Sequence, residues 1–284
     1  MSSDTSPSLF PEILISDSAT RLTLQDAGAV AYCASHGGAY CALLARAAGL
    51  RAIILNDAGV GIGQAGIGAL DVLDADNVPA AMLGHMSACI GLGADGAQHG
   101  QISYVNATAA ALGVVPGMSC QEALRRLHDR APEVAPDPSR VAQEHRTEHR
   151  LGTGDAVVIA DSVSLVQPED AGRVVVCGSH GGLLGGDPRT AVRAPVHAIV
   201  FNDADRGKDN AGLSRLPALD ARGIAGACVS AWTAPIGDGM ATFEQGVISA
   251  LNRTAIEAGA RPGMTTIEFA TLMADQAERA ARSR

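Results

Sequence analysis

The sequence predicts an α/β protein made of two tandem homologous units, an internal duplication with mainly parallel sheets and a pseudo-twofold relation. Residues 26–38 (DAGAVAYCASHGG) and 170–182 (DAGRVVVCGSHGG) are identical at nine of thirteen positions. Residues 100–118 and 246–264 are identical at ten of nineteen. In both copies short apolar runs alternate with helix-like stretches, which is the pattern of a parallel sheet covered by helices.

Composition divides the chain into four parts. We expect a flexible tail at residues 1–9, the first α/β repeat at residues 10–128 and the second α/β repeat at residues 151–284. Residues 129–150 are rich in proline and charge, so we expect a linker there, with a short helix at 139–149.

Four short apolar runs in each copy predict buried strands. They lack helical spacing and are bounded by turn formers, as expected of buried parallel strands. The runs are 13–16, 29–34, 51–55 and 78–83 in the first copy, and 156–160, 173–178, 196–201 and 224–229 in the second.

Stretches between and after these runs predict helices. Ser119 and Thr265 are expected to be N-caps, each with a glutamate three residues later that completes a capping box. Asn106 and Asn252 would then lie within helices, where we expect buried structural ties rather than catalytic groups. The helices are expected at 40–49, 101–112, 120–128, 247–258 and 266–282.

Charge and composition exclude several kinds of partner. The net charge is −9 and the basic residues are scattered, so a phosphate backbone would be repelled and nucleic acid is excluded as a partner. No apolar run reaches the roughly 18–20 residues that span a bilayer, and the first residues do not resemble a secretory signal. We therefore expect a cytoplasmic protein that binds a small polar or anionic metabolite, with a homo-oligomer as an open alternative.

No organic cofactor is predicted. Residues 61–66 match the glycine spacing of a dinucleotide fingerprint, but residues 207–212 of the second copy do not keep the full pattern, since Asp209 stands in place of the middle glycine. The six cysteines form no CxxC pair, so neither a disulfide framework nor a zinc knuckle is indicated. Cys33 and Cys177 are repeat equivalents, which we interpret as small buried hydrophobic residues, with a nucleophile as the alternative.

Polar residues shared by both copies follow the apolar runs, where parallel strands deliver their ligands. A further set of candidate residues comes from the loop that includes Asp238 and Gly239, before the helix predicted at 247–258. The catalytic candidates are Ser35, His36, Asp57, Ser179, His180 and Asp203. The substrate-binding candidates are Asp17, Gly37, Gly38, Asn56, Asp161, Gly181, Gly182, Asn202, Arg206, Lys208, Asp238 and Gly239.

Each kind of candidate has a chemical role and a structural alternative. An imidazole can act as general acid or base with an aspartate orienting its ring. A serine can be the nucleophile or a hydrogen-bond donor, and the Gly-Gly amides can bind an oxyanion. The alternatives are a structural histidine at the sheet edge, an Asx turn or N-cap, and a turn that needs positive φ.

The two copies differ at 59–63 against 205–209, where glycines are replaced by charged residues. This favours one asymmetric site between the copies, with two separate sites, one of them decayed, as the alternative. We expect an enzyme that hydrolyses an amide or related C–N bond without an organic cofactor. The alternatives are a lyase or isomerase that uses the same acid/base residues, a small-anion binding protein, and a hydrolase that holds a divalent metal.

Overall fold

The structure is a computed structural model that describes residues 13–140, 143–151 and 156–282. The tail predicted at residues 1–9 lies outside the described residues. Within those ranges, no helix combines the length and the apolar character needed to cross a membrane.

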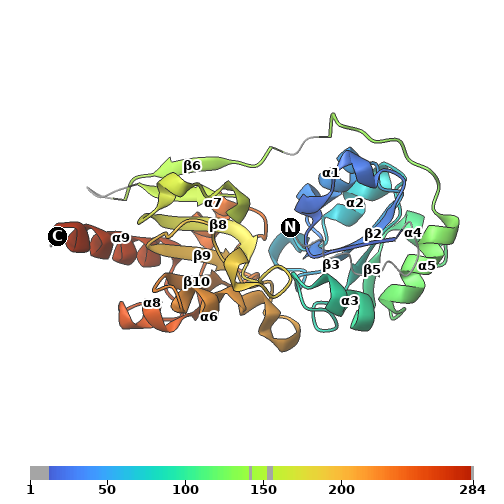
Figure 1. The fold of residues 1–284 in the computed structure, drawn as a ribbon. Coiled ribbons are helices and arrows are strands. Elements are labelled where there is room, and N and C mark those ends of the chain that lie inside the picture. Colours follow the sequence, from blue (N-terminus) through green and yellow to red (C-terminus); the bar gives the residue numbers. More distant parts are fainter. Residues whose placement is uncertain (1–12, 141–142, 152–155, 283–284) are drawn as a thin grey trace. The chain divides into compact units, whose positions relative to one another are not determined.

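The chain folds into two compact α/β units, each with its own sheet (Figure 1). Packing groups Met1–Ala58 with Gly66–Ala142 in the first unit, and Gly59–Ala65 with Gln143–Arg284 in the second. Both sheets are mixed and mainly parallel, which confirms the predicted fold class of tandem α/β units. The pseudo-twofold relation stays a prediction.

The sheet of the first unit has five strands in the order β1-β2-β3-β4-β5. Strands β1 to β4 are parallel and correspond to the four predicted runs, and β5 is antiparallel to β4. The strands are β1 (Ile13–Ser16), β2 (Val30–His36), β3 (Ala52–Asn56), β4 (Ala80–Leu83) and β5 (Ile102–Val105).

Helices cover both faces of this sheet (Figure 1). Helices α1 and α2 pack on one face, with Ala45 and Leu73 in the core. Helix α5 packs on the other face through Leu124 and Leu127. The helices are α1 (Ala39–Ala48), α2 (Ala69–Ala75), α3 (Gly93–His99), α4 (Ala107–Ala111) and α5 (Cys120–Arg130).

The sheet of the second unit has six strands in the order β11-β10-β9-β8-β7-β6. Strands β7 to β10 are parallel, and the two edge strands are antiparallel to their neighbours. The strands are β6 (Arg146–His149), β7 (Val157–Ala160), β8 (Val174–His180), β9 (Ala198–Asn202), β10 (Ala225–Val229) and β11 (Ile248–Leu251).

The helices of the second unit also cover both faces of their sheet. Phe243 and Phe269 pack on one face, and Leu216 and Leu219 pack on the other. The helices are α6 (Arg215–Asp220), α7 (Gly239–Gln245), α8 (Arg253–Glu257) and α9 (Thr266–Arg282).

Two predicted helices, at 101–112 and 247–258, are wrong in their first halves. The first forms β5 and then α4, and the second forms β11 and then α8. The strand pattern lasts only four residues and runs into a helix-forming segment, so the whole stretch resembles one helix in sequence. Pairing with β4 and β10 supplies the backbone hydrogen bonds that override this local preference.

Asn106 and Asn252 consequently lie at the N-caps of short helices rather than within longer ones. The Nδ2 group of Asn106 donates to the carbonyl of Val78 (2.8 Å), and its Oδ1 accepts from the amides of Ala80 (3.0 Å) and Ala109 (2.8 Å). Asn252 makes the equivalent contacts. The prediction that both are buried structural ties is confirmed.

The predicted capping box is complete at Thr265. Its Oγ1 accepts from the amide of Glu268 (3.2 Å), whose carboxylate accepts from the amide of Thr265 (2.7 Å). At Ser119 only half of the box forms: Oγ accepts from the amide of Glu122 (3.3 Å), and the Glu122 carboxylate binds Arg126 (2.8 Å).

The segment predicted as a linker, residues 129–150, packs at both of its ends. The amide of Asp137 donates to the carbonyl of Arg46 (3.0 Å), and Arg140 binds the carboxylate of Asp76 (2.6 Å). These contacts hold the first half of the segment on the first unit.

The helix predicted at 139–149 is wrong, because residues 146–149 form the edge strand β6. Arg146 donates to the fully buried carboxylate of Asp170 (2.6 Å), and Arg173 binds Glu148 (2.7 Å). These ion pairs attach β6 to the second sheet, a contact between distant segments that the local sequence does not reveal.

The described segment 183–196, which corresponds to α1, forms no α-helix and contains one short 3-10 helix, Pro188–Thr190. Gly185 and Gly186 have positive φ, which is not compatible with a continuous α-helix. Arg215, which is 1% exposed, donates to the carbonyls of Gly182 (2.9 Å) and Thr190 (2.6 Å) and thereby holds this segment on the sheet.

Candidate functional site

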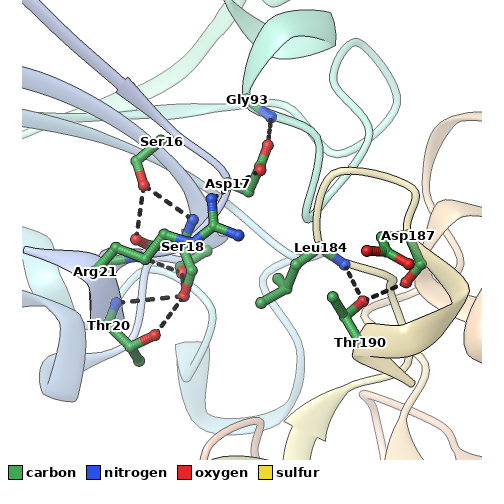
Figure 2. A network of polar contacts seen from close by, with 11 residues as sticks. Ser16, Asp17, Ser18, Thr20, Arg21, Gly93, Leu184, Asp187 and Thr190 are labelled. Carbon is green, nitrogen blue, oxygen red and sulfur yellow. Dashed lines mark hydrogen bonds and ion pairs between the residues drawn. The ribbon is translucent and has the colours of Figure 1, made fainter. Parts of the chain in front are cut away.

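The first polar pair, Asp17 and Asp161, binds a helix N-terminus in each unit. Oδ1 of Asp17 accepts from the amide of Gly93 (2.9 Å), as Figure 2 shows, and Oδ1 of Asp161 accepts from the amide of Gly239 (3.0 Å). These bonds satisfy amides that the first turn of a helix leaves without a partner. The structural role accounts for why both copies carry an aspartate here.

Ser35 and Ser179 are bound to the turns that follow β1 in the first unit and β7 in the second. Oγ of Ser35 accepts from the amide of Ala19 (2.9 Å), and Oγ of Ser179 accepts from the amide of Val163 (2.9 Å). In the described ranges, neither serine hydroxyl contacts a histidine nitrogen. The geometry therefore gives no support to a serine nucleophile activated by histidine.

His36 and His180 end strands β2 and β8 and make the same local contact. Nδ1 of His36 accepts from the amide of Gly38 (3.1 Å), and Nδ1 of His180 accepts from the amide of Gly182 (3.1 Å). A nitrogen that accepts carries no proton, so the neutral ring is protonated at Nε2. Burial lowers the pKa of His36 to about 4, which keeps this ring neutral at physiological pH.

The Gly-Gly amides are engaged within the fold. The amide of Gly37 donates to the carbonyl of Asn56 (2.8 Å), and that of Gly181 to the carbonyl of Asn202 (2.8 Å). None of the four glycines has positive φ, so the alternative explanation, a turn that needs positive φ, is wrong. A Cβ at Gly37 would overlap the Met82 sulfur, and close packing is therefore the reason for glycine there.

Asn56 and Asn202 tie the end of the central strand to the next loop. Nδ2 of Asn56 donates to the carbonyl of Ala88 (3.0 Å), and its Oδ1 accepts from the amide of Ala58 (2.9 Å). Asn202 repeats both contacts, and both side chains are fully buried. These residues position the loops and do not face a ligand.

Asp57 is paired with a histidine that the comparison of the two copies does not indicate. Its Oδ1 accepts from the backbone amide of His85 (2.8 Å) and lies 2.9 Å from Nδ1 of the same residue. His36 makes its one described hydrogen bond with Gly38, so the predicted pairing of His36 with Asp57 is not formed. The only sequence signal is that His85 closely follows a strand end, and the second copy has Ala231 at this position.

The second unit has a different arrangement around Asp203. Its Oδ1 accepts from the amides of Asp205 and Ala231 (2.9 Å each), and its Oδ2 accepts from the hydroxyl of Ser249 (2.7 Å). Ala231 can offer only its backbone amide. Equivalent aspartates therefore orient an imidazole in the first unit and a loop in the second.

Two other His–Asp pairs provide a reference for the His85–Asp57 pair. Nδ1 of His99 lies 3.1 Å from Asp95, with the imidazole 51% exposed. His145 binds Asp161 with 78% of its side chain exposed, whereas the His85 and Asp57 side chains are 23% and 5% exposed. Solvent screens the first two pairs strongly and the His85–Asp57 pair much less.

The loops that follow β3 and β9 share a strained backbone. Ala58–Gly61 and Ala204–Gly207 each have four consecutive residues with positive φ. In each loop an amide bonds the carbonyl two residues earlier, from Gly61 to Gly59 and from Gly207 to Asp205 (2.7 Å each). These are γ-turns with positive φ at the central residue, a rare and strained form.

Val60 and Arg206 occupy the strained central positions, with φ of 64° and 63°. A β-branched residue there is an outlier, and such strain clusters at functional sites. The duplicated strain has no signal in the sequence, because one loop is rich in glycine and the other in charge.

The remaining predicted residues lie on loops and caps of the second unit. Arg206 is exposed and donates to the carbonyl of Ser249 (3.1 Å), and Lys208 begins a short 3-10 segment. Asp238 is the N-cap of α7, where its Oδ1 accepts from the amide of Ala241 (2.8 Å).

The cysteine interpretation agrees with the structure. Cys33 and Cys177 are fully buried, and burial raises the pKa of both thiols, that of Cys177 to about 12. Neither is a thiolate at neutral pH, so a nucleophilic role is not supported. Across the described ranges, no group of three or more His, Cys, Asp or Glu side chains is arranged to hold a metal ion.

No protein-family model, curated protein or solved structure matches this chain.

Proposed function

We propose that this protein is an acid/base enzyme for a small polar metabolite, of the lyase or isomerase class, and that His85 is its base. The observation that carries the proposal is the buried carboxylate of Asp57, which binds both the backbone amide and the Nδ1 of His85.

The tautomer of His85 suits a general base. An ionised carboxylate accepts hydrogen bonds only, so Nδ1 of His85 carries a proton and Nε2 carries the lone pair. The carboxylate also stabilises the imidazolium that forms when Nε2 takes a proton, the role of the aspartate in catalytic triads. The second contact, to the backbone amide, fixes the carboxylate in place.

Hydrolysis through a serine nucleophile fits the geometry less well. The hydroxyl oxygens of Ser35 and Ser179 accept hydrogen bonds from backbone amides. The Gly-Gly amides, which we expected to bind an oxyanion, also donate hydrogen bonds within the fold. Proton abstraction by a histidine needs neither group, and this supports a lyase or isomerase over the hydrolase.

A metabolite screen tests the proposal. Small hydroxy acids, oxo acids, amides and amino acids are incubated with the protein and followed by NMR. We expect the wild type to convert at least one compound, and His85→Ala to convert it at least about 100-fold more slowly, the usual contribution of a general base.

His99→Ala is the matched control, since His99 also binds a carboxylate but is half exposed. We expect this variant to keep the wild-type rate. Conversion by His85→Ala at the wild-type rate would refute the proposal. A compound that raises the thermal midpoint and returns unchanged would favour the small-anion binding protein instead.

A further inference from the structure

His36 presents a fixed hydrogen-bond donor at the carboxyl edge of the first sheet. The amide of Gly38 donates to Nδ1 of His36 at 3.1 Å, so the proton of the neutral ring is on Nε2. His180 receives the same contact from Gly182 at the same distance. The Gly-Gly sequence thus sets the tautomer of the preceding histidine in both units.

Among the residues that the structure describes, the imidazole of His36 makes one hydrogen bond, at Nδ1, so its Nε2–H group has no partner there. The neighbouring amides of Gly37 and Gly38 already donate, one to Asn56 and the other to the imidazole. The amides predicted to bind an oxyanion are therefore engaged, and the imidazole N–H is the donor of His36–Gly38 that remains for a ligand.

His36 is the last residue of β2, and His85 follows β4, another strand of the same parallel set. His36 is in register with Asn56 on β3, and Asn56 is in register with Leu83 on β4, two residues before His85. Two strand spacings separate β2 from β4, about 10 Å. The two histidines therefore lie near the same edge of one sheet, the placement that a small molecule held by both would need.

We propose that the Nε2–H of His36 donates a hydrogen bond to a carbonyl oxygen of the substrate, so that the substrate is a small carbonyl compound with a C–H bond next to the carbonyl. This inference rests on the proposed function, in which His85 takes the proton.

The two histidines then have separate roles in one reaction: His85 takes the proton and His36 stabilises the oxygen. Nε2 of His85 removes the proton from the carbon beside the carbonyl, and the C–H electron pair forms a C=C bond. The carbonyl π electrons move to oxygen, and the resulting enolate oxygen accepts the hydrogen bond from His36. In an isomerase the substrate carries an α-hydroxyl: its proton passes to the enolate oxygen, the former carbonyl carbon takes the proton back from the His85 imidazolium, and the α-carbon becomes the new carbonyl. In a lyase the enolate re-forms the carbonyl, its C=C electrons form a bond between the α- and β-carbons, and the β-substituent departs with its bonding pair and takes the proton from the His85 imidazolium.

Burial supports this division of roles. It lowers the pKa of His36 to about 4, so the ring stays a neutral donor across the physiological range and does not act as a base there. A neutral imidazole that polarises a carbonyl beside a separate base is a known catalytic arrangement.

Imidazole 15N NMR on the whole protein tests the donor directly. We expect His36 to carry its proton on Nε2 and to stay neutral from pH 8 to pH 5.5. A ring protonated on Nδ1, or one that titrates in this range, would overturn the inference without touching the role of His85.

Binding of acetone, pyruvate and acetamide, each labelled with 13C at the carbonyl carbon, tests the acceptor. We expect a downfield carbonyl shift for at least one probe with wild type. We expect the shift to be lost in His36→Leu and kept in part in His36→Gln, whose amide can donate from nearly the same place. His85→Ala should keep the shift, because it removes the base and not the donor.

The outcomes separate the two proposals. A shift that is absent for all three probes, or that persists in a folded His36→Leu variant, would overturn the role of His36. If His36→Leu unfolds, wild type is compared with His36→Gln instead. An unaltered carbonyl shift in His36→Gln, together with a charged His36 in the 15N spectra of wild type, would contradict the inference. If turnover is lost in His85→Ala but kept in the His36 variants, the proposed function is supported and the inference about His36 is not.

Discussion

His36 accepts a hydrogen bond at Nδ1 from a backbone amide, whereas the buried carboxylate of Asp57 accepts from Nδ1 of His85. These partners place the single proton of each neutral ring on opposite nitrogens. The sequence indicates only that both residues follow strands. The choice between donor and base depends on contacts that form in the folded chain.

The depressed pKa of His36 predicts a pH-dependent stability. Between pH 6.5 and pH 4 the unfolded chain binds a proton that folded His36 does not bind, so the free energy of unfolding falls as pH falls. The full loss is about 3 kcal/mol. Urea unfolding at pH 7 and pH 4.5 should show a smaller loss for His36→Gln than for wild type. Equal losses would show that burial does not depress this pKa.

Because the γ-turns are strained, we expect a substitution by glycine at their central position to raise the free energy of unfolding. Arg206 is exposed and has φ of 63°, a conformation that costs a non-glycine residue about 1–2 kcal/mol. We expect Arg206→Gly to raise the free energy of unfolding by about 0.5–1 kcal/mol, because strain relief exceeds the entropy that glycine adds to the unfolded chain.

Arg253→Gly is the control, because Arg253 is also exposed but lies in the right-handed backbone of helix α8. It should lower the free energy of unfolding by about 1 kcal/mol. If both variants are destabilised equally in urea unfolding, the turn at Arg206 is not strained.

At the scale of elements, the sequence predicts the parallel strands well and the edge strands poorly. The eight apolar runs all form strands, since burial on both faces requires continuous apolar residues. Strands β5 and β11 resemble helices in sequence, and β6 lies in a segment that resembles a linker. Edge strands depend on a neighbouring strand, which local patterns do not contain.

The attachment of β6 predicts a large effect of one carboxylate. Asp170 is fully buried and binds Arg146 at 2.6 Å. Asp170→Asn would remove the buried counter-charge of Arg146 and leave this partly buried guanidinium only the longer ion pair with the exposed Glu148 (3.8 Å), so we expect a loss of about 3 kcal/mol and faster amide exchange in β6. Glu257→Gln, which removes an exposed ion pair with Arg253, should change little. Unaltered exchange in Asp170→Asn would show that the ion pair does not hold β6.

At the scale of the whole molecule, comparing the duplicated units identifies some residues of the candidate site and misses others. Comparing the two copies identifies Asp57 and Asp203, but it passes over His85, because the second copy has Ala231 there. Most shared polar residues, such as Asn56, hold loops rather than ligands. Shared residues thus indicate the scaffold, whereas the proposed base lies where the two copies differ.

This asymmetry predicts unequal effects of equivalent changes. Asp57→Asn should lower turnover at least about 100-fold, because it removes the charge that stabilises the His85 imidazolium. Asp203→Asn should keep turnover within about tenfold and lower the thermal midpoint, since Asp203 binds only loop and strand donors. Equal losses of turnover would mean that both units perform the chemistry.

Solvent deuterium exchange tests the central claim, that His85 held by Asp57 moves the proton. The converted metabolite is incubated in D2O with wild type, His85→Ala or His99→Ala, and incorporation at the carbon that loses its proton is followed by NMR. We predict incorporation with wild type and His99→Ala, and at least about a 100-fold slower rate with His85→Ala. Incorporation by a folded His85→Ala variant at the wild-type rate would contradict the claim.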